Sequence, residues 1–123
     1  MASWETVWEL LAALPGTEQG LLHDNPAVRV GGKLVAYLPD NDRSRPAHAS
    51  EQDEVLVVKT GFAERAALLE QDPDTFFVTP HYQSYPGVLV RLATVRPDQL
   101  RELLTEAWRL VAPRRLLRQL DQA

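Results

Sequence analysis

The sequence predicts a single α+β domain over residues 1–123, in which a mainly antiparallel sheet of about five strands is packed by three helices. A chain of 123 residues suits one hydrophobic core. Some apolar segments have the three- and four-residue spacing of helices, and others alternate as strands do. Short connections join successive strands, which favours antiparallel neighbours. The expected order is helix, three strands, helix, two strands, helix.

The first expected element is a helix that begins after Ser3, because serine is favoured at helix N-caps. Pro15-Gly16 provides the stop signal. The apolar residues between them share one face, which we expect to be buried. Two tryptophans on that face also suit a ligand platform, but helical spacing is more typical of a core. The residues of this face are Trp4, Val7, Trp8, Leu11 and Leu14.

A hairpin is expected over residues 27–38, where Gly31-Gly32 separates two β-rich runs. Two glycines allow the positive φ angles of a tight turn. A phosphate-binding loop is excluded here, because the lysine that follows the glycines continues into a strand rather than a helix. The expected register pairs Val30 with Lys33, Arg29 with Leu34 and Val28 with Val35, so that the three valines share one face and Ala36 lies on the other.

A polar segment and further elements follow the hairpin. Residues 39–53 contain no large apolar side chain and predict a mobile loop, because they can bury almost nothing. Pro97 suits the first position of the last helix, and Pro113 interrupts that helix. The expected elements are strands at 54–59, 75–79 and 87–93, helices at 62–71 and from 97 onward, and a kinked or separate helical turn at 114–120.

The composition restricts the function classes. The chain has no cysteine, which excludes disulfides, thiolate catalysis and cysteine-based metal sites. It has no apolar run of about 18 residues and no signal-peptide pattern, so we expect no membrane association and a cytoplasmic location. No motif indicates a cofactor, and none is expected.

The charge is unevenly distributed. The net charge is -4, but residues 1–90 carry 6 Lys and Arg against 13 Asp and Glu, whereas residues 91–123 carry 7 against 4. An acidic protein that binds nucleic acid must gather its basic groups on one face. The C-terminal third is therefore the expected place for a polyanion site, and a solvated charged surface is the alternative.

The candidate nucleic-acid-binding residues are Arg114, Arg115 and Arg118 near the C-terminus and Arg29 and Lys33 on the hairpin. Arg43 and Arg45 add positive charge in the predicted loop. By contrast, Arg101 and Arg109 follow Asp98 and Glu106 by three positions and are expected to pair with them along the helix.

The segment HYQSYP, residues 81–86, allows three interpretations: a chemical site, a surface that stacks on a partner, or a loop that closes the core. His81, Tyr82 and Tyr85 are candidates for stacking on exposed bases or for a structural role at the sheet edge. The prolines at 80 and 86 stiffen both ends, and the Tyr85-Pro86 bond is a candidate for the cis form.

The chain contains five short motifs between Trp4 and Leu117, in this order: LPG, VGGK, LLEQDP, PHYQSYPGVLVRL and EAWRLVAPRR. In these motifs and their order the chain resembles the MmcQ/YjbR family of small bacterial proteins. The resemblance implies a compact YjbR-like α+β fold with a double-wing arrangement of hairpins. The resemblance also implies DNA binding, which is assigned to the family from the shape of its fold, and it implies no catalytic residue. The polar segment at 39–53 departs from the family's pattern.

We therefore expect a DNA-binding module without catalytic activity, and two alternatives stay open. In the first, the protein binds a small ligand or is an enzyme, with His81 transferring protons near Ser84 or meeting His23-Asp24 as metal ligands; the spacing is not diagnostic. In the second, it is a protein-interaction module, either a monomer or a weak homodimer, with sheet edges or C-terminal leucines as the interface. These leucines are Leu116, Leu117 and Leu120.

Overall fold

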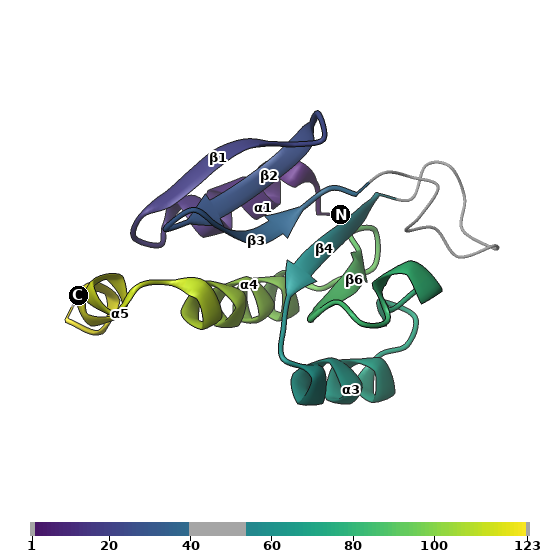
Figure 1. Ribbon diagram of the computed structural model, residues 1–123. Helices are drawn as coiled ribbons and strands as arrows, with labels where there is room; N and C mark the ends of the chain where they lie inside the picture. Colours follow the sequence, from purple (N-terminus) through teal and green to yellow (C-terminus); the bar gives the residue numbers. More distant parts are fainter. Residues whose placement is uncertain (1, 40–53, 123) are drawn as a thin grey trace.

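The computed structural model describes residues 2–39 and 54–122 (Figure 1). Within these ranges one six-stranded antiparallel sheet has the order β1-β2-β3-β4-β6-β5. The α+β class is confirmed. The strands are β1 (Thr17–Leu22), β2 (Asn25–Val30), β3 (Lys33–Tyr37), β4 (Val55–Lys59), β5 (Phe76–Phe77) and β6 (Gly87–Arg91). The helices are α1 (Trp4–Ala12), α3 (Phe62–Gln71), α4 (Pro97–Val111) and α5 (Arg114–Asp121), and η1 (Pro80–Tyr82) is a 3-10 turn.

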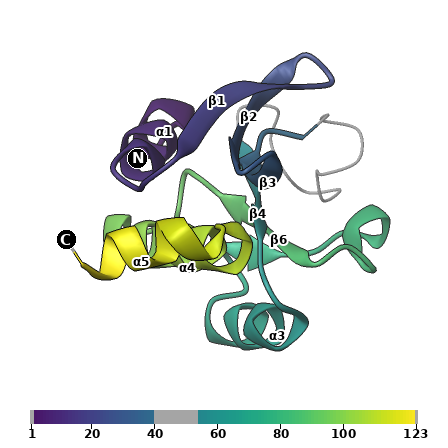
Figure 2. The same ribbon diagram turned by 60° about the vertical axis from the view of Figure 1, so that its left-hand side comes forward.

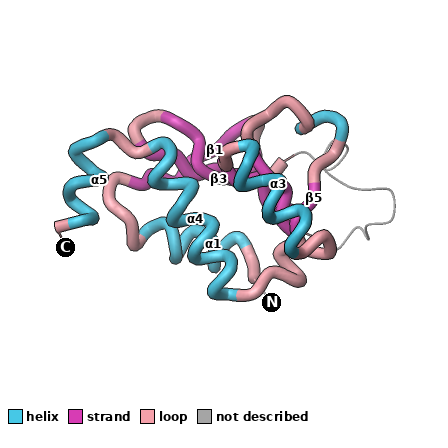
Figure 3. The backbone as a smooth tube through the Cα atoms, turned by 90° about the horizontal axis from the view of Figure 1, so that it is seen from below, coloured by secondary structure: helices cyan, strands magenta, loops and turns pink. Residues whose placement is uncertain are grey.

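The α-helices gather on one face of the sheet. In Figure 2 α1 and α4 lie to the left of the strands and the segment that contains η1 lies to the right, and in Figure 3 α1 and α4 lie below the strands and that segment lies above them. The larger core lies between the sheet and the helices and includes the fully buried Trp108, Leu104 and Leu11. A smaller core on the opposite face includes Tyr37 and Tyr82. Both faces of the sheet are therefore partly covered.

Six strands are present where about five were expected, because β1 has no strand signal in the sequence. Four of its six residues are exposed, so it lacks the apolar alternation of a half-buried strand. His23 and Asp24 form its tight turn to β2 with φ angles of 50° and 67°. Such a turn usually contains glycine or asparagine, and this pair does not give that signal.

The predicted hairpin is present as β2 and β3, with one correction to its register. Val30 pairs with Lys33 and Arg29 with Leu34, but Val28 pairs with Ala36 instead of Val35. The register shift is a β-bulge, in which one extra residue of β3 is accommodated. As a result Val35 and Ala36 both lie in the helix-side core with Val28, and the prediction that Ala36 lies on the other face is wrong.

The helix boundaries agree closely with the sequence signals. Ser3 accepts a hydrogen bond from the Thr6 amide as the N-cap of α1, and α4 begins at Pro97. The separate helical turn predicted at 114–120 is present as α5, a fourth helix, which Pro113 with its extended backbone separates from α4. The predicted strand at 75–79 is confined to β5, and the mobile loop predicted at 39–53 lies outside the described residues except for Pro39. In the described ranges no helix combines the length and apolar character that a membrane span requires.

Candidate functional site

The segment HYQSYP covers the second face of the sheet. Tyr82 is only 7% exposed and packs in the smaller core with Tyr37 and Leu89. The rings therefore close a sheet face rather than the sheet edge, which corrects the expected location. The peptide bond between Tyr85 and Pro86 is trans, so the proposed cis bond is wrong.

One arginine of α3 holds this segment. Arg65 Nη1 donates hydrogen bonds to the carbonyl oxygens of Tyr82 (3.3 Å), Tyr85 (2.9 Å) and Gly87 (3.3 Å). Its Nη2 donates to the carbonyl of Gln83 at 2.9 Å. The planar guanidinium has several donors in a fixed geometry, which suits one side chain to several converging carbonyls. The sequence contained no signal for this role, since Arg65 lies 17 to 22 residues from its partners.

All three tyrosines of the chain meet in this region. Tyr37 comes from β3, and Tyr82 and Tyr85 come from the HYQSYP segment. The ring centroids of Tyr82 and Tyr85 are 6.0 Å apart in an edge-to-face arrangement. Burial raises the pKa of Tyr37 above its ordinary value, and the hydrogen bond with Tyr82 raises it further. Burial also raises the pKa of Tyr85. The Tyr37 and Tyr85 phenols therefore stay protonated to a higher pH than a solvent-exposed phenol does.

We expect this cluster to make the protein sensitive to alkali. Unfolded tyrosines ionise near pH ~10, whereas Tyr37 and Tyr85 resist ionisation in the folded protein. Ionisation then stabilises the unfolded state, so the free energy of unfolding should fall above about pH 10 and stay unaffected by these groups below it. Near-ultraviolet phenolate absorbance, followed with circular dichroism, tests this. Complete ionisation with a midpoint near ~10 in a folded protein would contradict it.

The tyrosines border a hollow that also brings two histidines together. His23 in the β1–β2 turn and His81 in η1 both line this hollow of about 230 Å³. The His81 ring stacks edge-on against the Tyr82 ring, with the ring centroids 4.8 Å apart. No hydrogen bond in the described ranges joins His81 to Ser84. Residues 2–39 and 54–122 contain no group of three or more His, Asp or Glu residues placed to hold a metal ion. The remaining residues of the hollow are Leu22, Asn25, Tyr37, Leu38, Pro39, Tyr82 and Tyr85.

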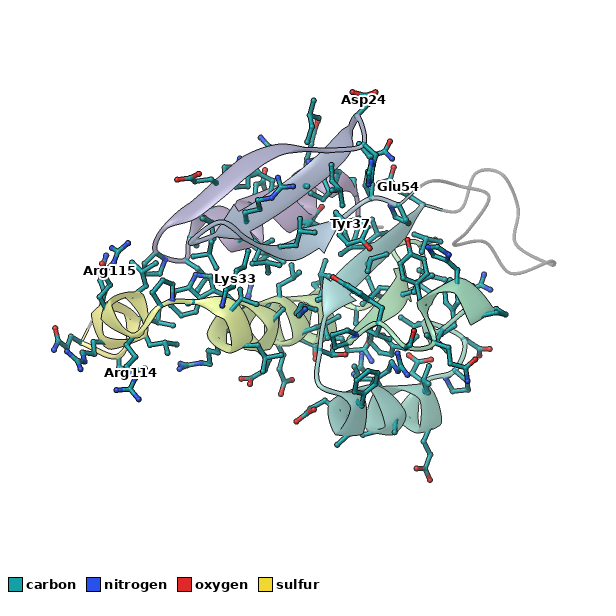
Figure 4. All side chains as sticks on the ribbon, in the orientation of Figure 1. Asp24, Lys33, Tyr37, Glu54, Arg114 and Arg115 are labelled. Carbon is teal, nitrogen blue, oxygen red and sulfur yellow. The ribbon has the colours of Figure 1, made fainter. Side chains whose placement is uncertain are left out.

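The C-terminal basic cluster lies on the solvent face of α5. Arg114, Arg115 and Arg118 are exposed and, at 3.6 residues per turn, lie within an arc of about 100°. The apolar side of the helix, which includes the buried Leu116, packs against the core. No ion pair with these arginines occurs in the described part of the chain. Figure 4 shows Arg114 and Arg115 projecting from different sides of α5.

The hairpin divides the other two basic candidates between its faces. Lys33 lies opposite Val30, whose side chain is in the helix-side core, so Lys33 lies on that side. The tip packs near α5, because a Cβ placed on Gly31 would lie 3.1 Å from the Pro113 side chain. Figure 4 accordingly places Lys33 beside the segment that joins α4 to α5. The structure brings Lys33 toward the α5 arginines.

Arg29 does not join this group. Its register position opposite Leu34 puts it on the other face of the hairpin, and its Nη1 donates to the carbonyl of Leu21 at 3.1 Å. It also lies opposite Glu18 of β1. The side chain is engaged with the edge strand, and Arg29 is therefore separated from the α5 cluster.

The helix pairings expected on α4 are replaced by others. Arg109 forms an ion pair with Asp121 of α5 at 3.5 Å instead of with Glu106. Asp98 pairs with Arg96 at 3.7 Å instead of with Arg101. Asp121 is the last residue of α5, so the turn between α4 and α5 decides its contact with Arg109. Arg96 is the N-cap of α4, so the start of that helix decides its contact with Asp98. Glu106 is left without an ion pair in the described ranges.

Comparison with known proteins identifies the family. The family model YjbR matches residues 12–110, which is most of the chain. The chain belongs to the YjbR family. Uncharacterized protein Rv2570 of Mycobacterium tuberculosis and Uncharacterized protein Mb2600 of Mycobacterium bovis are each 38% identical to it over 124 residues. The alignments cover 95% of this chain and 94% of each relative.

A solved structure supports the YjbR fold. The crystal structure of Deinococcus radiodurans protein DR2400, with the family-model domain DUF419, matches with a TM-score of 0.74. The match covers 98% of this chain and 89% of that chain at 18% sequence identity. At this identity the likeness concerns the fold alone. The predicted MmcQ/YjbR resemblance is confirmed by the family match.

Proposed function

We propose that this YjbR protein binds double-stranded DNA through its backbone phosphates, without catalysis. The proposal is carried by one observation: the solvent face of α5 presents Arg114, Arg115 and Arg118 without an ion pair in the described ranges. Guanidinium groups bind phosphate oxygens in a bidentate manner. An arginine without an ion pair can do so without first breaking a contact with a carboxylate. Lys33 adds a fourth positive charge from the hairpin tip.

The charge distribution supports the location of this surface. Residues 1–90 carry a net charge of -7, from 6 basic and 13 acidic residues, and most of the molecule should therefore repel DNA. The α5 end is the part that attracts it, and this restricts how DNA can approach. The contacts are to phosphate and so supply affinity and orientation rather than sequence preference. Tyr82 is not included, because it is buried in the smaller core, and neither are His81 and Tyr85, because their segment lies on the other side of the sheet from α4 (Figure 2).

Binding should weaken steeply as salt rises from about 50 to 200 mM, because each phosphate contact releases counterions. Replacing Arg114, Arg115 and Arg118 together by glutamine should reduce the slope of log affinity against log salt by about three. Fluorescence anisotropy with two short duplexes of unrelated sequence measures this slope, and both duplexes should give the same result.

The matched control removes three other arginines, Arg29, Arg96 and Arg101, and so changes the net charge by the same amount. This control should retain most of the affinity, since these residues lie away from the solvent face of α5. If both triple variants lose affinity equally, net charge rather than the α5 surface is responsible. If the unmodified protein fails to bind DNA at low salt, the proposal is wrong.

A further inference from the structure

A groove between α3 and α4 has no part in the proposed DNA surface. Its volume is about 390 Å³, which is within the range of small-molecule sites. Its floor and walls include apolar side chains from both helices and from β5, and Leu110 at its edge is 58% exposed. None of the residues of α3 is fully buried, so this helix covers the core incompletely. The apolar residues of the groove are Ala67, Leu68, Phe76, Leu103, Ala107 and Leu110.

Carboxylates border this apolar surface on both sides. Glu102 and Glu106 lie four residues apart on α4, and both line the groove, so two like charges lie one turn apart on one face. Glu64 of α3 lines the opposite wall, and its carboxylate folds back over Gly61. None of the three forms an ion pair in the described part of the chain. The groove therefore carries uncompensated negative charge.

The two cations at the groove are otherwise engaged. Arg96 pairs with Asp98 at 3.7 Å. Lys59 comes from the end of β4, and its ammonium lies 5.2 Å from the centroid of the Tyr85 ring, which belongs to the opposite side of the sheet. Neither side chain pairs with the three glutamates. With Asp98, four carboxylates line the groove against two cations, so its lining is net negative and suits a positively charged ligand.

A buried hydroxyl at the same groove has no partner. Thr60 lines the groove, is 5% exposed, and its Oγ1 has no hydrogen bond in the structure. Buried hydroxyl groups are almost always hydrogen-bonded, so an unpaired one indicates a missing partner. Thr60 and Glu64 place a hydroxyl group and a negative charge at one end of the α3 wall.

From these features we propose that the α3–α4 groove binds an organic amine. Its apolar body contacts Leu68, Phe76 and Leu103, its ammonium group lies between Glu64 and the two glutamates of α4, and Thr60 supplies a hydrogen bond. Carboxylates on both walls disfavour an anionic ligand. A docked α-helix is disfavoured, because a helix with its side chains is about 10 Å across and is too wide for a groove of this volume. This inference is independent of DNA binding, which uses α5.

Three probes with the same alkyl chain separate the contributions of charge and apolar contact: hexylamine, hexanol and hexanoate. Each is titrated into the isotopically labelled full chain, and amide resonances are followed by NMR. Hexylamine should shift the resonances of Thr60, Gly61, Leu68 and Leu103 in a saturable manner. Hexanol should bind more weakly, and hexanoate should leave these resonances unchanged. Equal shifts with all three probes would overturn the assignment of an amine site.

Variants test the named residues. Glu102→Gln with Glu106→Gln should weaken hexylamine binding roughly fivefold, as expected for the loss of exposed charge pairs. Glu5→Gln with Glu9→Gln on α1 removes the same charge outside the groove and should leave binding unchanged. If the two double variants weaken binding equally, overall charge is responsible and the site is wrong.

Thr60→Val separates the hydroxyl from the shape of the side chain, because valine has nearly the same volume. It should raise the melting temperature, since it removes an unpaired buried hydroxyl, and it should weaken hexylamine binding. An unchanged affinity in a folded Thr60→Val protein would remove Thr60 from the ligand site. The melting temperature also shows whether the variant is folded, so the two readings are distinguishable.

Discussion

Replacing Arg65 by alanine should lower the free energy of unfolding by roughly 2 to 4 kcal/mol, because hydrogen bonds to a charged donor are among the stronger ones and several are lost together. Arg65 donates to the carbonyl oxygens of Tyr82, Gln83, Tyr85 and Gly87. Without Arg65 the carbonyls of Tyr82 and Tyr85 keep only the backbone amides of Tyr85 and Gly87 as donors, and all four carbonyls lose their charged donor. The HYQSYP segment would then lose its anchor to α3 and its packing over the second face of the sheet.

Arg65→Lys is the informative companion variant. Lysine keeps the charge but lacks the planar fork, so it cannot reach carbonyls on four residues at once. We expect it to recover less than half of the lost stability in urea unfolding. Arg101→Lys, at an exposed position of α4, should have little effect and serves as the control. If Arg65→Lys is as stable as the unmodified protein, positive charge alone is sufficient and the fork geometry is irrelevant.

Amide hydrogen exchange locates the effect of Arg65. The amides of Tyr85 and Gly87 donate within the segment, to Tyr82 and Tyr85 respectively. In Arg65→Ala they should exchange faster than expected from the change in global stability, because the segment opens locally. Uniform acceleration across the whole protein would instead indicate that Arg65 supports the fold generally.

Trp108→Ala should lower the free energy of unfolding by about 3 to 5 kcal/mol, the usual cost of removing a large buried aromatic side chain. This is a large share of a typical total of roughly 5 to 15 kcal/mol. Trp108 is fully buried in the helix-side core, and its Nε1 donates a hydrogen bond to the carbonyl of Pro15 at 2.9 Å. One side chain thereby connects α4 to the segment after α1.

Trp108→Phe separates the hydrogen bond from the packing. Phenylalanine fills most of the space but leaves the Pro15 carbonyl without its donor, which should cost about 1 to 3 kcal/mol. Trp8→Ala is the matched control, because Trp8 is only partly buried at the edge of the same core. Urea unfolding of the three variants should give the order Trp108→Ala, Trp108→Phe, Trp8→Ala, from most to least destabilised. A larger loss for Trp8→Ala would contradict the assignment of Trp108 as the central core residue.

Local features of the sequence were sufficient for most elements of the fold. The N-cap Ser3, the first helical residue Pro97 and the turn Gly31-Gly32 act on their immediate neighbours, and each element lies where these residues predict. The basic cluster of α5 was also visible, because its three arginines lie within two turns of one helix. The strand β1 was not, since its stability comes from hydrogen bonds to β2 rather than from its own apolar pattern.

The contacts between distant residues depend on the tertiary structure. The β-bulge changes which residue Val28 faces, and the ion pair of Arg109 with Asp121 joins α4 to the last residue of α5. The four hydrogen bonds of Arg65 and the hollow shared by His23 and His81 likewise join segments far apart in the chain. No spacing rule relates such residues.

The sequence by itself determined the α+β class, the helix boundaries, the family and the basic face of α5. Only the tertiary structure decided that HYQSYP is a buried cover held by Arg65, that Arg29 is separated from the α5 cluster, and that α3 and α4 border an acidic groove. The physical reason is the separation along the chain over which each interaction acts. Helix caps, turn glycines and apolar periodicity act within a few residues, whereas sheet pairing and side-chain networks depend on where the whole chain brings its segments together.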